Sequence, residues 1–572
     1  MISKRNRLRK LRQKGMEMLK QQTGIVKGMQ LWGREITEGM QCIGEGEAKF
    51  CIYPDAAPNL YTALVRTSER LPEKIGIVDD DGHAYCYSEI LRMTRELASY
   101  LYFDKGIKQG AHAGLMMHNR IEFCIAFFAL SALSAVAVPL PSKFKRKEVL
   151  SLSERADVSL VICEEEYADW FSELLPEEKI ISVTEKAGEY GFAQSFLERR
   201  KGDCRERDAE AEPFVCSLGS GAGSADALIM FTSGTTSMSK GVLLKNDNLM
   251  QAVESYRRIL HITEADISVL ATPIYHITGL IALLGLFVTA GGRLHLHRLF
   301  DAKRVLDEAR RFSFTFIHAS PTVFHLLLQE GENTPEIPSL RSFACGSSNM
   351  MKDKLLRLHS WLPNSSFHTV YGLTETSSPA AIFPGDAASS KYIGSSGLPI
   401  PGTEFKIVDE CGEPLPKGSV GEIAVRGSVV LEKYYRQSTD NLRDGWLYTG
   451  DLGYFNEENY LYVVDRKKNM INRGGEKIWC YDVENEISSM EGVEDAAVVG
   501  IPDDVYGEVA AAAVQCAEES GLTAETITQY LRNRIAKYKI PVKFLFLHSI
   551  PQTANGKPDK NEIRRLLTEE KS

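Results

Sequence analysis

Residues 114–140 have the sequence GLMMHNRIEFCIAFFALSALSAVAVPL. This run predicts a short apolar strand, an amphipathic helix and a second strand that ends at Pro139. Apolar strands that alternate with helices are typical of parallel sheets whose two faces are both covered. We therefore expect the surrounding part of the chain to have an α/β fold.

The alternation of strand and helix signals begins near Tyr61 and extends beyond this stretch. It continues in ADVSLVI (156–162) and resumes in ALIMF (227–231), after a stretch at 200–226 that we interpret as a linker or surface loop. After Gly394 the pattern changes to short alternating strands with Gly and Pro turns, as in TEFKIVDE, GEIAVRG and NYLYVVD. These strands predict a small antiparallel sheet or barrel. The last hundred residues have further strand and helix signals, in AAVVGIP and AETITQYLRNRIAKY.

Composition narrows the class of protein. The chain has 572 residues, 44% of them apolar, and 67 Lys and Arg against 76 Asp and Glu, a net charge of −9 that disfavours nucleic acid as the main partner. Its eleven cysteines form no C-x-x-C pair, which favours a reducing compartment over a disulfide framework or a zinc ribbon. The chain has no run of about 18 consecutive apolar residues, so we expect no membrane-spanning helix. We therefore expect a cytoplasmic protein.

The first 20 residues differ from the rest, because they carry eight Lys and Arg and the single acid Glu17. They contain no apolar segment of the kind that a signal peptide requires. We interpret them as a solvated extension. A basic helix that contacts anionic lipid at the membrane surface is the alternative.

The most informative run is LIMFTSGTTSMSKGV, at 228–242. An apolar strand leads into small and hydroxyl-bearing residues, and a lysine follows. Small residues let the backbone N–H groups turn inward, hydroxyls add donors and the lysine adds a positive charge, which together suit a polyphosphate. The run is not the ordinary P-loop pattern, and a Ser/Thr-rich surface turn is the alternative when it is taken alone.

This run resembles the signature loop of adenylate-forming enzymes, the superfamily of acyl-CoA synthetases, non-ribosomal peptide adenylation domains and beetle luciferases. Six further segments resemble the superfamily's other motifs, in the same order: FACGSSNM (343–350), VYGLTET (370–376), GEIAVRG (421–427), GWLYTGDLGY (445–454), DRKKNMINRGGEKI (465–478) and PQTANGKPDK (551–560). The resemblance covers the chain after about residue 50. It implies a basic N-terminal extension (1–50), a large AMP-binding domain (51–465) of two βαβ-type layered subdomains and a small antiparallel β-barrel, and a small mobile α+β C-terminal lid domain (466–572).

The resemblance also implies roles for individual residues in the nucleotide site. The β- and γ-phosphates of ATP would bind to Thr232, Ser233, Gly234, Thr235, Thr236 and Lys240. The family usually has Gly where Ser237 stands and often Pro where Ser239 stands, and neither change removes a charge or a hydroxyl. Tyr371 and Gly372 would lie by the adenine opposite Gly346 and Ser347, Thr374 would contact the α-phosphate, Glu375 would bind Mg²⁺, and Asp451 and Arg466 would contact the ribose and nucleotide.

Four more residues have implied roles in the exchange between two half-reactions. Lys468 would be the pivot between the domains, and Gly474 and Gly475 would flank the path of the pantetheine arm. Lys557 would bridge the carboxylate and the α-phosphate during adenylation, and a rotation of the small domain would then remove it.

The segment ATPIYHITGL (271–280) is expected to border the acyl group, with His276 at its entrance; a buried, satisfied histidine is the alternative. Amino-acid-activating relatives typically have an aspartate here, whereas 275–280 has no acid to pair with an α-ammonium group. We therefore expect a fatty, aryl or other plain carboxylic acid. Because the chain ends soon after Lys557, the acceptor is expected to be free coenzyme A or a separate acyl carrier protein.

The sequence thus predicts an ATP- and Mg²⁺-dependent acid–thiol ligase, an acyl-CoA synthetase that acts through an acyl-adenylate. Three alternatives stay open. They are a freestanding adenylating enzyme that loads an acyl carrier protein, a non-catalytic nucleotide-binding homologue, and a membrane-recruited scaffold that uses residues 1–20.

Overall fold

The stretch 114–140 forms the predicted strand, helix and strand, namely β6 (His112–Met116), α5 (Ile121–Ala132) and β7 (Val136–Pro139). β6 and β7 are parallel neighbours. Nearly every residue of α5 is buried, including Glu122, whose carboxylate accepts from Arg120 Nε at 2.7 Å. The expectation of an amphipathic helix was therefore wrong: a helix packed between layers must be apolar on all sides.

The computed structural model describes residues 24–44, 50–184, 223–232, 239–332, 334–347, 350–517, 520–553 and 557–569. α5 covers a seven-stranded sheet. Five neighbouring strands of this sheet are parallel: β10, β7, β6, β8 and β9. The pairs β10–β11 and β11–β21 are antiparallel. The strand order is β21 (Lys433–Tyr434), β11 (Lys240–Lys245), β10 (Asp226–Thr232), β7, β6, β8 (Leu160–Glu164), β9 (Ile180–Val183). α7 (Glu165–Phe171) packs on β8 and β9 and α6 (Arg146–Arg155) on α7, while α3 (Leu60–Arg70) and α4 (Tyr87–Phe103) pack against α5.

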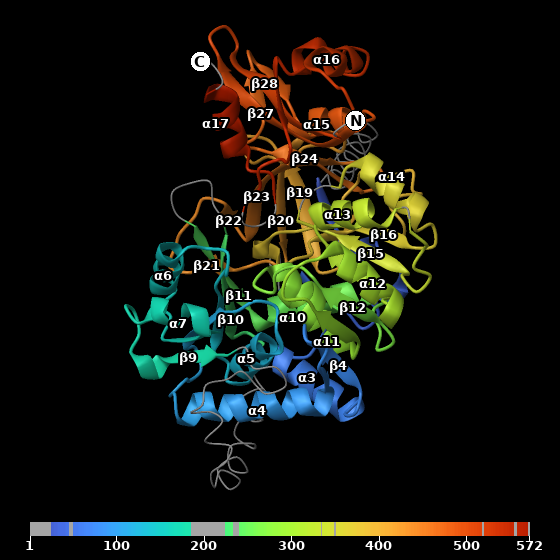
Figure 1. Cartoon of the computed structure of the whole chain (residues 1–572). Coiled ribbons are helices and arrows are strands. Elements are labelled where there is room, and N and C mark those ends of the chain that lie inside the picture. Colours follow the sequence, from blue (N-terminus) through green and yellow to red (C-terminus); the bar gives the residue numbers. More distant parts are fainter. Residues whose placement is uncertain are drawn as a thin grey trace, which may run out of the picture.

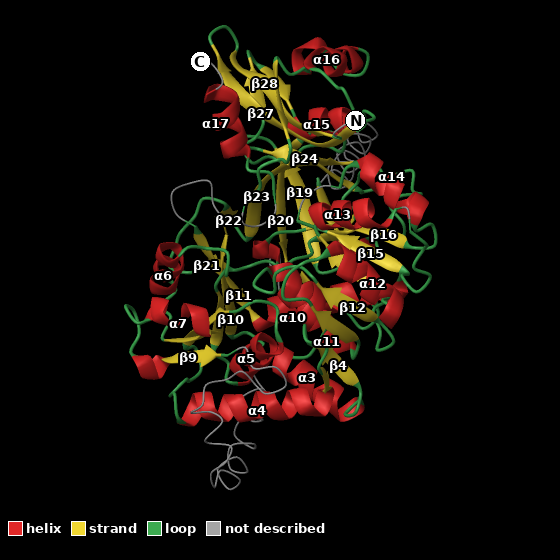
Figure 2. Ribbon diagram, in the orientation of Figure 1, coloured by secondary structure: helices red, strands yellow, loops and turns green. Residues whose placement is uncertain are grey.

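A second layered unit contains two further sheets, which lie beside the first unit in Figure 2. One sheet has the order β12 (Ile267–Leu270), β13 (Arg293–Leu296), β4 (Ile75–Val78), β5 (Ala84–Cys86). The other has the order β14 (Phe316–Ala319), β15 (Ser342–Cys345), β16 (Ser366–Tyr371), β17 (Ala381–Ile382), β18 (Leu398–Pro399). Its helices include α10 (Asn246–Ile259), a π-helical segment (Thr278–Gly285), α11 (Leu286–Ala290), α12 (Ala302–Phe312), α13 (Pro321–Gly331) and α14 (Lys352–Trp361). Strands β14, β15 and β16 are parallel, so their carboxyl ends meet at one edge.

The predicted antiparallel unit is a six-stranded sheet. Its order is β1 (Ile25–Lys27), β19 (Thr403–Val408), β20 (Gly421–Gly427), β23 (Trp446–Phe455), β22 (Leu442–Arg443), with β24 (Leu461–Arg466) also paired to β23. β1 comes from the segment that the sequence analysis assigned to an N-terminal extension, and it pairs with β19. Trp32 Nε1 also donates to the carbonyl oxygen of Pro399, so this segment packs on the large part of the chain.

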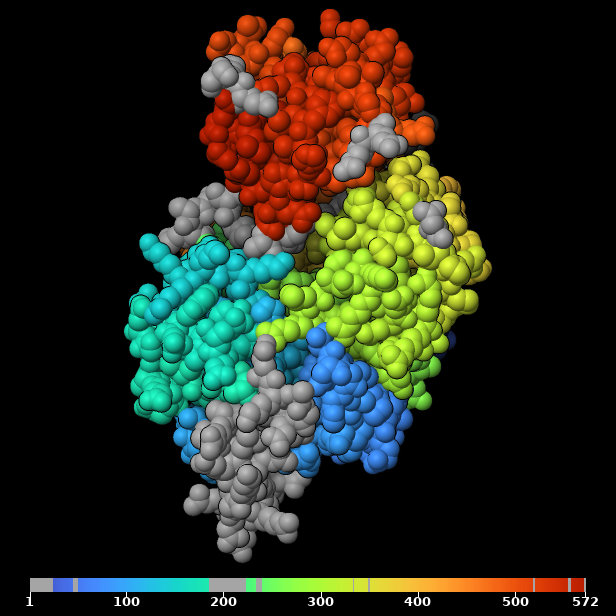
Figure 3. All heavy atoms as spheres, in the orientation of Figure 1, coloured from blue at the N-terminus to red at the C-terminus, as the bar shows by residue number. Residues whose placement is uncertain are grey.

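The C-terminal part is a separate small α+β unit that lies above the two layered units in Figures 1 and 3. Its five-stranded sheet contains β26 (Glu476–Ile478), β25 (Ile471–Arg473), β28 (Gly507–Cys516), β27 (Val493–Asp503) and β29 (Lys543–Leu547), and its helices are α15 (Cys480–Ser488), α16 (Ala524–Arg532) and α17 (Lys560–Glu569). Two polar contacts join it to the α14 region: Lys354 Nζ lies 3.3 Å from Asp495 Oδ1, and the Tyr481 hydroxyl donates to Met350 O at 3.2 Å. The fold is therefore mixed α/β with a large N-terminal part and a small C-terminal one.

Four further expectations concern the N-terminus, the linker, the cysteines and membrane-spanning helices. The basic residues 1–20 and most of the linker stretch, 200–222, lie outside the described residues. Cys42 and Cys51 form a disulfide across β2 (Gln41–Ile43) and β3 (Phe50–Ile52), a pairing that the absence of C-x-x-C did not predict. Among the described residues, every helix is too short or too polar to cross a bilayer.

Candidate active site

The carboxylate of Asp451 lies at the centre of the predicted nucleotide site. Asp451 on β23 and Arg466 on β24 are register partners, so their side chains leave the same face of the antiparallel sheet. Arg466 Nε lies 2.6 Å from Asp451 Oδ1, and the Tyr371 hydroxyl donates to Asp451 Oδ2 at 2.9 Å. Asp451 is buried, so these donors hold both carboxylate oxygens in fixed positions. The structure thus brings together three predicted residues from β16, β23 and β24.

Glu375 lies beside this group, in a 3₁₀ turn (Thr374–Thr376) that follows β16. Its Oε1 accepts a hydrogen bond of 3.1 Å from the Tyr434 hydroxyl, and Lys240 Nζ lies 5.4 Å from the centre of the Tyr434 ring. Burial raises the pKa of Glu375, while the positive charges of Arg466 and Lys240 oppose the rise. Tyr434 is a site residue that the sequence analysis missed.

The predicted phosphate loop joins β10 to β11. Thr232 ends β10 and Lys240 begins β11, and the two are register partners across this antiparallel pair. The four residues between them that were predicted to bind phosphate, Ser233, Gly234, Thr235 and Thr236, lie outside the described residues, as does Ser237. The structure therefore fixes the two ends of the loop, and Lys240 shares the site with Glu375 through the Tyr434 ring.

Lys557 reaches this site from the C-terminal part of the chain. Its backbone is held by a two-way contact with Thr553, whose N–H donates to Lys557 O at 2.8 Å and whose Oγ1 accepts from Lys557 N at 3.4 Å. Burial, together with the positive charge of Arg466, lowers the pKa of Lys557 to about 8, and the carboxylate of Asp451 opposes that shift. The charges of Arg466 and Asp451 act on Lys557 in opposite directions, so the lysine lies near these two predicted nucleotide-site residues.

His276 lies close enough to Lys557 for the positive charge of the lysine to lower the pKa of the imidazole. Burial, with the positive charges of Lys557 and Lys143, lowers the pKa of His276 to about 4, so the ring is neutral near pH 7. Lys143 follows β7 and is a second cation that the sequence analysis did not assign to the site. The predicted acyl-group segment and the predicted catalytic lysine therefore meet at one place.

The two segments predicted to enclose the adenine end parallel strands β15 and β16. Gly346 follows β15, and Ser347 next to it has a φ of 73°. Gly372 follows β16 at a position where a Cβ atom would lie 1.4 Å from Ser378 O, so only glycine fits this turn. The carboxyl edge of this sheet therefore carries both segments, as the rule for open α/β sheets predicts.

The three residues predicted to serve domain exchange lie just beyond β24. Lys468 is exposed and separates β24 from β25. Gly474 and Gly475 form the tip of the hairpin between β25 and β26, with φ values of 59° and 97° that favour glycine. The structure thus explains these glycines first as residues of a tight hairpin turn.

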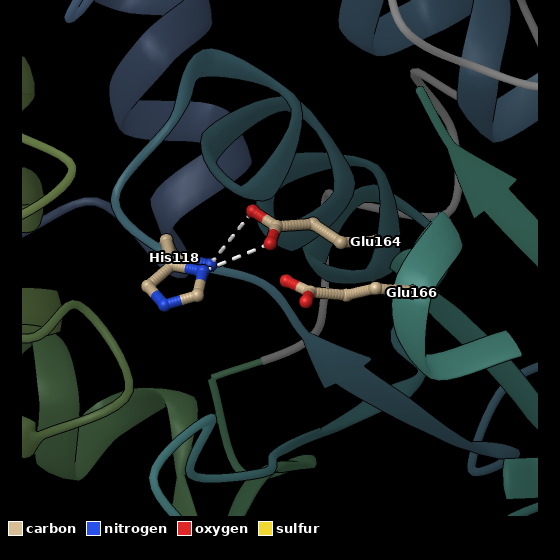
Figure 4. Close-up of side chains that lie close together, drawn as sticks. All are labelled: His118, Glu164 and Glu166. Carbon is tan, nitrogen blue, oxygen red and sulfur yellow. Dashed lines mark hydrogen bonds and ion pairs between the residues drawn. The ribbon is translucent and has the colours of Figure 1, made fainter. Parts of the chain in front are cut away.

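A group of possible metal ligands lies at the ends of β6 and β8 (Figure 4). Its members are His118, Glu164 and Glu166, with His118 Nδ1 2.8 Å from Glu164 Oε2. Two guanidinium groups already neutralise the buried Glu164, because Arg298 Nη2 lies 3.2 Å and Arg120 Nη1 3.6 Å from its oxygens. The group is therefore an ion-pair network, because the two arginines supply the positive charge that a bound cation would otherwise supply.

Comparisons with known proteins give the same picture. A family model described as AMP-binding enzyme matches residues 64–435, and one described as AMP-binding enzyme C-terminal domain matches residues 482–557. The feruloyl-CoA synthase of Amycolatopsis sp is 29% identical over 489 residues, which cover 85% of this chain and 94% of the relative. The indoleacetate–CoA ligase of Aromatoleum aromaticum is 30% identical over 490 residues, with coverage of 84% and 93%. The o-succinylbenzoate coenzyme A synthetase (MenE) from Bacillus subtilis, solved in complex with ATP and magnesium ion, has a TM-score of 0.72 and 28% identity, with coverage of 87% and 98%.

Proposed function

The chain belongs to the AMP-binding enzyme family, and from this premise we propose that it is an ATP-dependent acyl-CoA synthetase for a fatty or aryl carboxylic acid. The acid attacks the α-phosphate of ATP and releases pyrophosphate, and the thiol of coenzyme A then displaces AMP from the acyl-adenylate. The relatives over nearly the whole chain are ligases and synthases of this kind. We propose free coenzyme A as the acyl acceptor, because both relatives are named as enzymes that form coenzyme A thioesters.

The observation that carries the proposal is the convergence of charges from three parts of the chain. Lys240 comes from the first layered unit, Asp451 and Arg466 from the antiparallel sheet and Lys557 from the C-terminal part. The charges of Arg466 and Asp451 both act on Lys557. Cations around one carboxylate suit a polyphosphate nucleotide, whose charge they neutralise as pyrophosphate leaves.

We assign the nucleotide contacts to these residues. Asp451 binds the ribose hydroxyls while Arg466 and Tyr371 hold its carboxylate, and Thr374 contacts the α-phosphate. Lys240, with Thr232 and the hydroxyl residues 233, 235 and 236, binds the β- and γ-phosphates. Gly346, Ser347, Tyr371 and Gly372 form the walls of the adenine pocket.

Glu375 fits the magnesium ion that the family's reaction requires. Its carboxylate is buried enough for its pKa to be raised, and Tyr434 donates to only one of its oxygens. A hard dication prefers such a carboxylate oxygen together with phosphate oxygens. When bound, the ion would neutralise charge on the phosphates, and Glu375 with Tyr434 would orient it.

Lys557 and His276 bind the carboxylate end of the acid, where the reaction takes place. The ammonium of Lys557 bridges the substrate carboxylate and the α-phosphate, and the neutral ring of His276 lies at the entrance to the acyl group. We further propose that Lys468 is the pivot of a C-terminal lid domain (466–572) on the large domain (51–465). A rotation there withdraws Lys557 and brings Gly474 and Gly475 beside the pantetheine arm.

The test separates the two half-reactions. Pyrophosphate release is measured with ATP·Mg²⁺ over fatty, aryl and dicarboxylic acids, with and without coenzyme A, while AMP and thioester are followed. We expect one acid class to give release that coenzyme A accelerates, with matching thioester. Release that hydroxylamine traps but coenzyme A does not turn over would instead support loading of a carrier protein, and no release with intact ATP binding would support a non-catalytic homologue.

The variant Lys557→Ala sharpens this test. It should slow adenylate formation by about 100-fold or more, as the loss of a single transition-state charge contact does, and leave thioester formation from supplied acyl-adenylate within a few-fold of wild type. Lys417→Ala is the matched control, because Lys417 is exposed and its Nζ only donates to Glu457 O at 2.8 Å. Equal loss of both half-reactions in a folded Lys557→Ala protein would contradict the role of this lysine.

A further inference from the structure

Three lysines stand close together in the segment that connects β7 to α6. The sequence SKFKRKE at 142–148 places Lys143, Lys145 and Lys147 at every second position. All three are exposed, and among the described residues no carboxylate forms an ion pair with any of them. We call these three residues the lysine patch. On a chain with a net charge of −9 it is a local positive surface without a counter-charge, which attracts an anion.

The other charged groups of this segment are already used within the fold. Arg146 Nη2 forms an ion pair with Glu173 and donates to Asp169 O at 3.3 Å. Glu148 accepts from the backbone N–H of Lys145 at 2.8 Å, which caps the first turn of α6. The cap fixes the start of the helix and therefore the backbone that carries the lysine patch.

One end of the lysine patch lies by the reacting end of the site. Burial and the positive charge of Lys557 lower the pKa of His276, and the charge of Lys143 adds to this shift. Lys145 and Lys147 do not contribute to it, so they lie farther from His276. The lysine patch thus extends from the place where acid and thiol are proposed to react toward solvent.

The opposite end of α6 contacts the proposed phosphate loop of the ATP site. Arg155, the last residue of α6, donates from Nη2 to the carbonyl oxygen of Ser239, which directly precedes Lys240. α6 has 10 residues, and a helix of that size is about 15 Å long. The lysine patch stands at the other end of this helix. It is therefore a second anion-binding surface, separate from the residues assigned to the β- and γ-phosphates of ATP.

Coenzyme A is the substrate whose charges fit this position. Its thiol must reach the acyl-adenylate near His276 and Lys557, while its phosphate groups lie at the far end of a long uncharged arm. Several phosphates held away from the reaction centre call for several cations away from it. Figure 1 shows α6 at the end of the first layered unit that is nearer to the C-terminal unit, the side of the proposed lid.

We propose that Lys143, Lys145 and Lys147 bind the phosphate groups of coenzyme A and guide its thiol to the acyl-adenylate. The inference rests on the proposed function and deepens it, because it assigns the nucleotide end of the thiol substrate to the large domain. The glycines 474 and 475 then flank only the uncharged arm. Exposed cations act through long-range attraction, so they raise the rate of association, and salt weakens their effect.

The test compares coenzyme A with pantetheine, which has the same thiol and no phosphate. The full-length variant Lys143→Gln/Lys145→Gln/Lys147→Gln is supplied with the acyl-adenylate of its preferred acid, and kcat/KM for thioester formation is measured with each thiol. We expect a loss of about tenfold or more with coenzyme A and of about twofold or less with pantetheine. Raising the ionic strength from about 0.05 to 0.5 M should lower kcat/KM for coenzyme A more in wild type than in the variant. Pyrophosphate release without coenzyme A should be unchanged.

The variant Lys108→Gln/Lys391→Gln/Lys417→Gln is the matched control, because it removes three exposed positive charges outside this segment. Its kcat/KM should stay within about twofold of wild type for both thiols. Equal losses with the two thiols, an undiminished kcat/KM for coenzyme A, the same loss in the control, or a raised KM for ATP in the lysine-patch variant would overturn the inference while leaving the proposed function standing. Absence of AMP and thioester with every acid would contradict the proposed function itself.

Discussion

The ammonium of Lys557 links the site's electrostatics to the pH dependence of the reaction. Its pKa is lowered to about 8, so the free enzyme loses this charge as the pH rises through that value. Adenylate formation needs the charge, and kcat/KM for pyrophosphate release should therefore fall about tenfold per pH unit above pH 8. Lys557→Arg should lack this limb, because a guanidinium stays charged. Thioester formation from supplied adenylate should rise with pH instead, as the thiolate of coenzyme A forms; a flat adenylation profile through pH 9.5 would refute the prediction.

The two donors on Asp451 predict graded effects on ATP binding. Asp451→Ala removes a buried charged acceptor, worth about 1.5–3 kcal/mol per bond, and should raise KM for ATP by about 10- to 100-fold. Tyr371→Phe removes only the hydroxyl that donates to Oδ2 and should raise it by about 2- to 10-fold. Steady-state kinetics with ATP as the varied substrate measure both. An Asp451→Ala enzyme with unchanged ATP dependence would exclude the ribose role.

Single residues differ in how far the sequence alone predicts them. Glu375, Asp451, Arg466 and Lys557 stand in contiguous motifs, and the structure places them close together. Tyr434 has no motif of its own: it meets Glu375 only because β21 pairs with β11, a contact between residues about 190 positions apart. Lys143 likewise resembles any surface lysine until its effect on the pKa of His276 is known.

At the scale of the element, the turn after β16 requires a glycine at position 372. In Gly372→Ala the new methyl group would lie 1.4 Å from Ser378 O, a backbone atom that cannot move alone. We expect a loss of about 1–3 kcal/mol in the free energy of unfolding and a larger KM for ATP. Gly346→Ala is the steric control, since its nearest contacts are at 3.5 Å, and its unfolding midpoint should match wild type. Denaturant unfolding distinguishes them; equal stabilities would show that the turn can shift.

Elements were predictable where local pattern and burial agree. The strands at 403–408 and 421–427 alternate as half-buried strands do, and both are found there. The prediction of an amphipathic helix at α5 was wrong because tertiary packing buries even Glu122, whose carboxylate accepts from Arg120. Burial on both sides is decided by neighbouring layers, which a single segment does not encode.

At the scale of the whole molecule, the sequence does not predict how the C-terminal part is placed on the large part. Its motifs predict a small unit with a lysine near its end, but its orientation depends on contacts such as Tyr481 with Met350 and Lys354 with Asp495, which join distant segments. In the observed arrangement the charges of Asp451 and Arg466 act on Lys557, which agrees with its proposed role in adenylation. The second orientation that we propose for thioester formation cannot be predicted from any local sequence pattern.

An ion pair inside the C-terminal part lies close to Lys557 along the chain. Lys560, three residues after Lys557, begins α17 and lies 2.9 Å from Glu484 Oε1 on α15, which also accepts from Val498 N at 2.8 Å. α15 is tied to the end of β24, because Cys480 N donates to Asp465 Oδ2 at 2.6 Å. Burial alone would lower the pKa of Lys560, but the carboxylate of Glu484 raises it; burial likewise raises the pKa of Glu484, and the charge of Lys560 opposes that rise. The network connects the predicted hinge to the catalytic loop.

Replacing both residues of this pair should restore the stability of the fold without restoring adenylate formation. Lys560→Met leaves Glu484 buried and unpaired and should cost about 3–5 kcal/mol of unfolding free energy. Adding Glu484→Leu should restore most of that stability, because two apolar side chains can replace a buried pair. If the pair positions Lys557, adenylate formation stays at least about tenfold below wild type in the stable double variant, which corresponds to about 1.4 kcal/mol of activation free energy, while thioester formation from supplied adenylate is unchanged. Arg565→Ala, in an exposed pair on the same helix, should change neither rate. Full recovery of adenylation in the double variant would show that Lys560 only stabilises the fold.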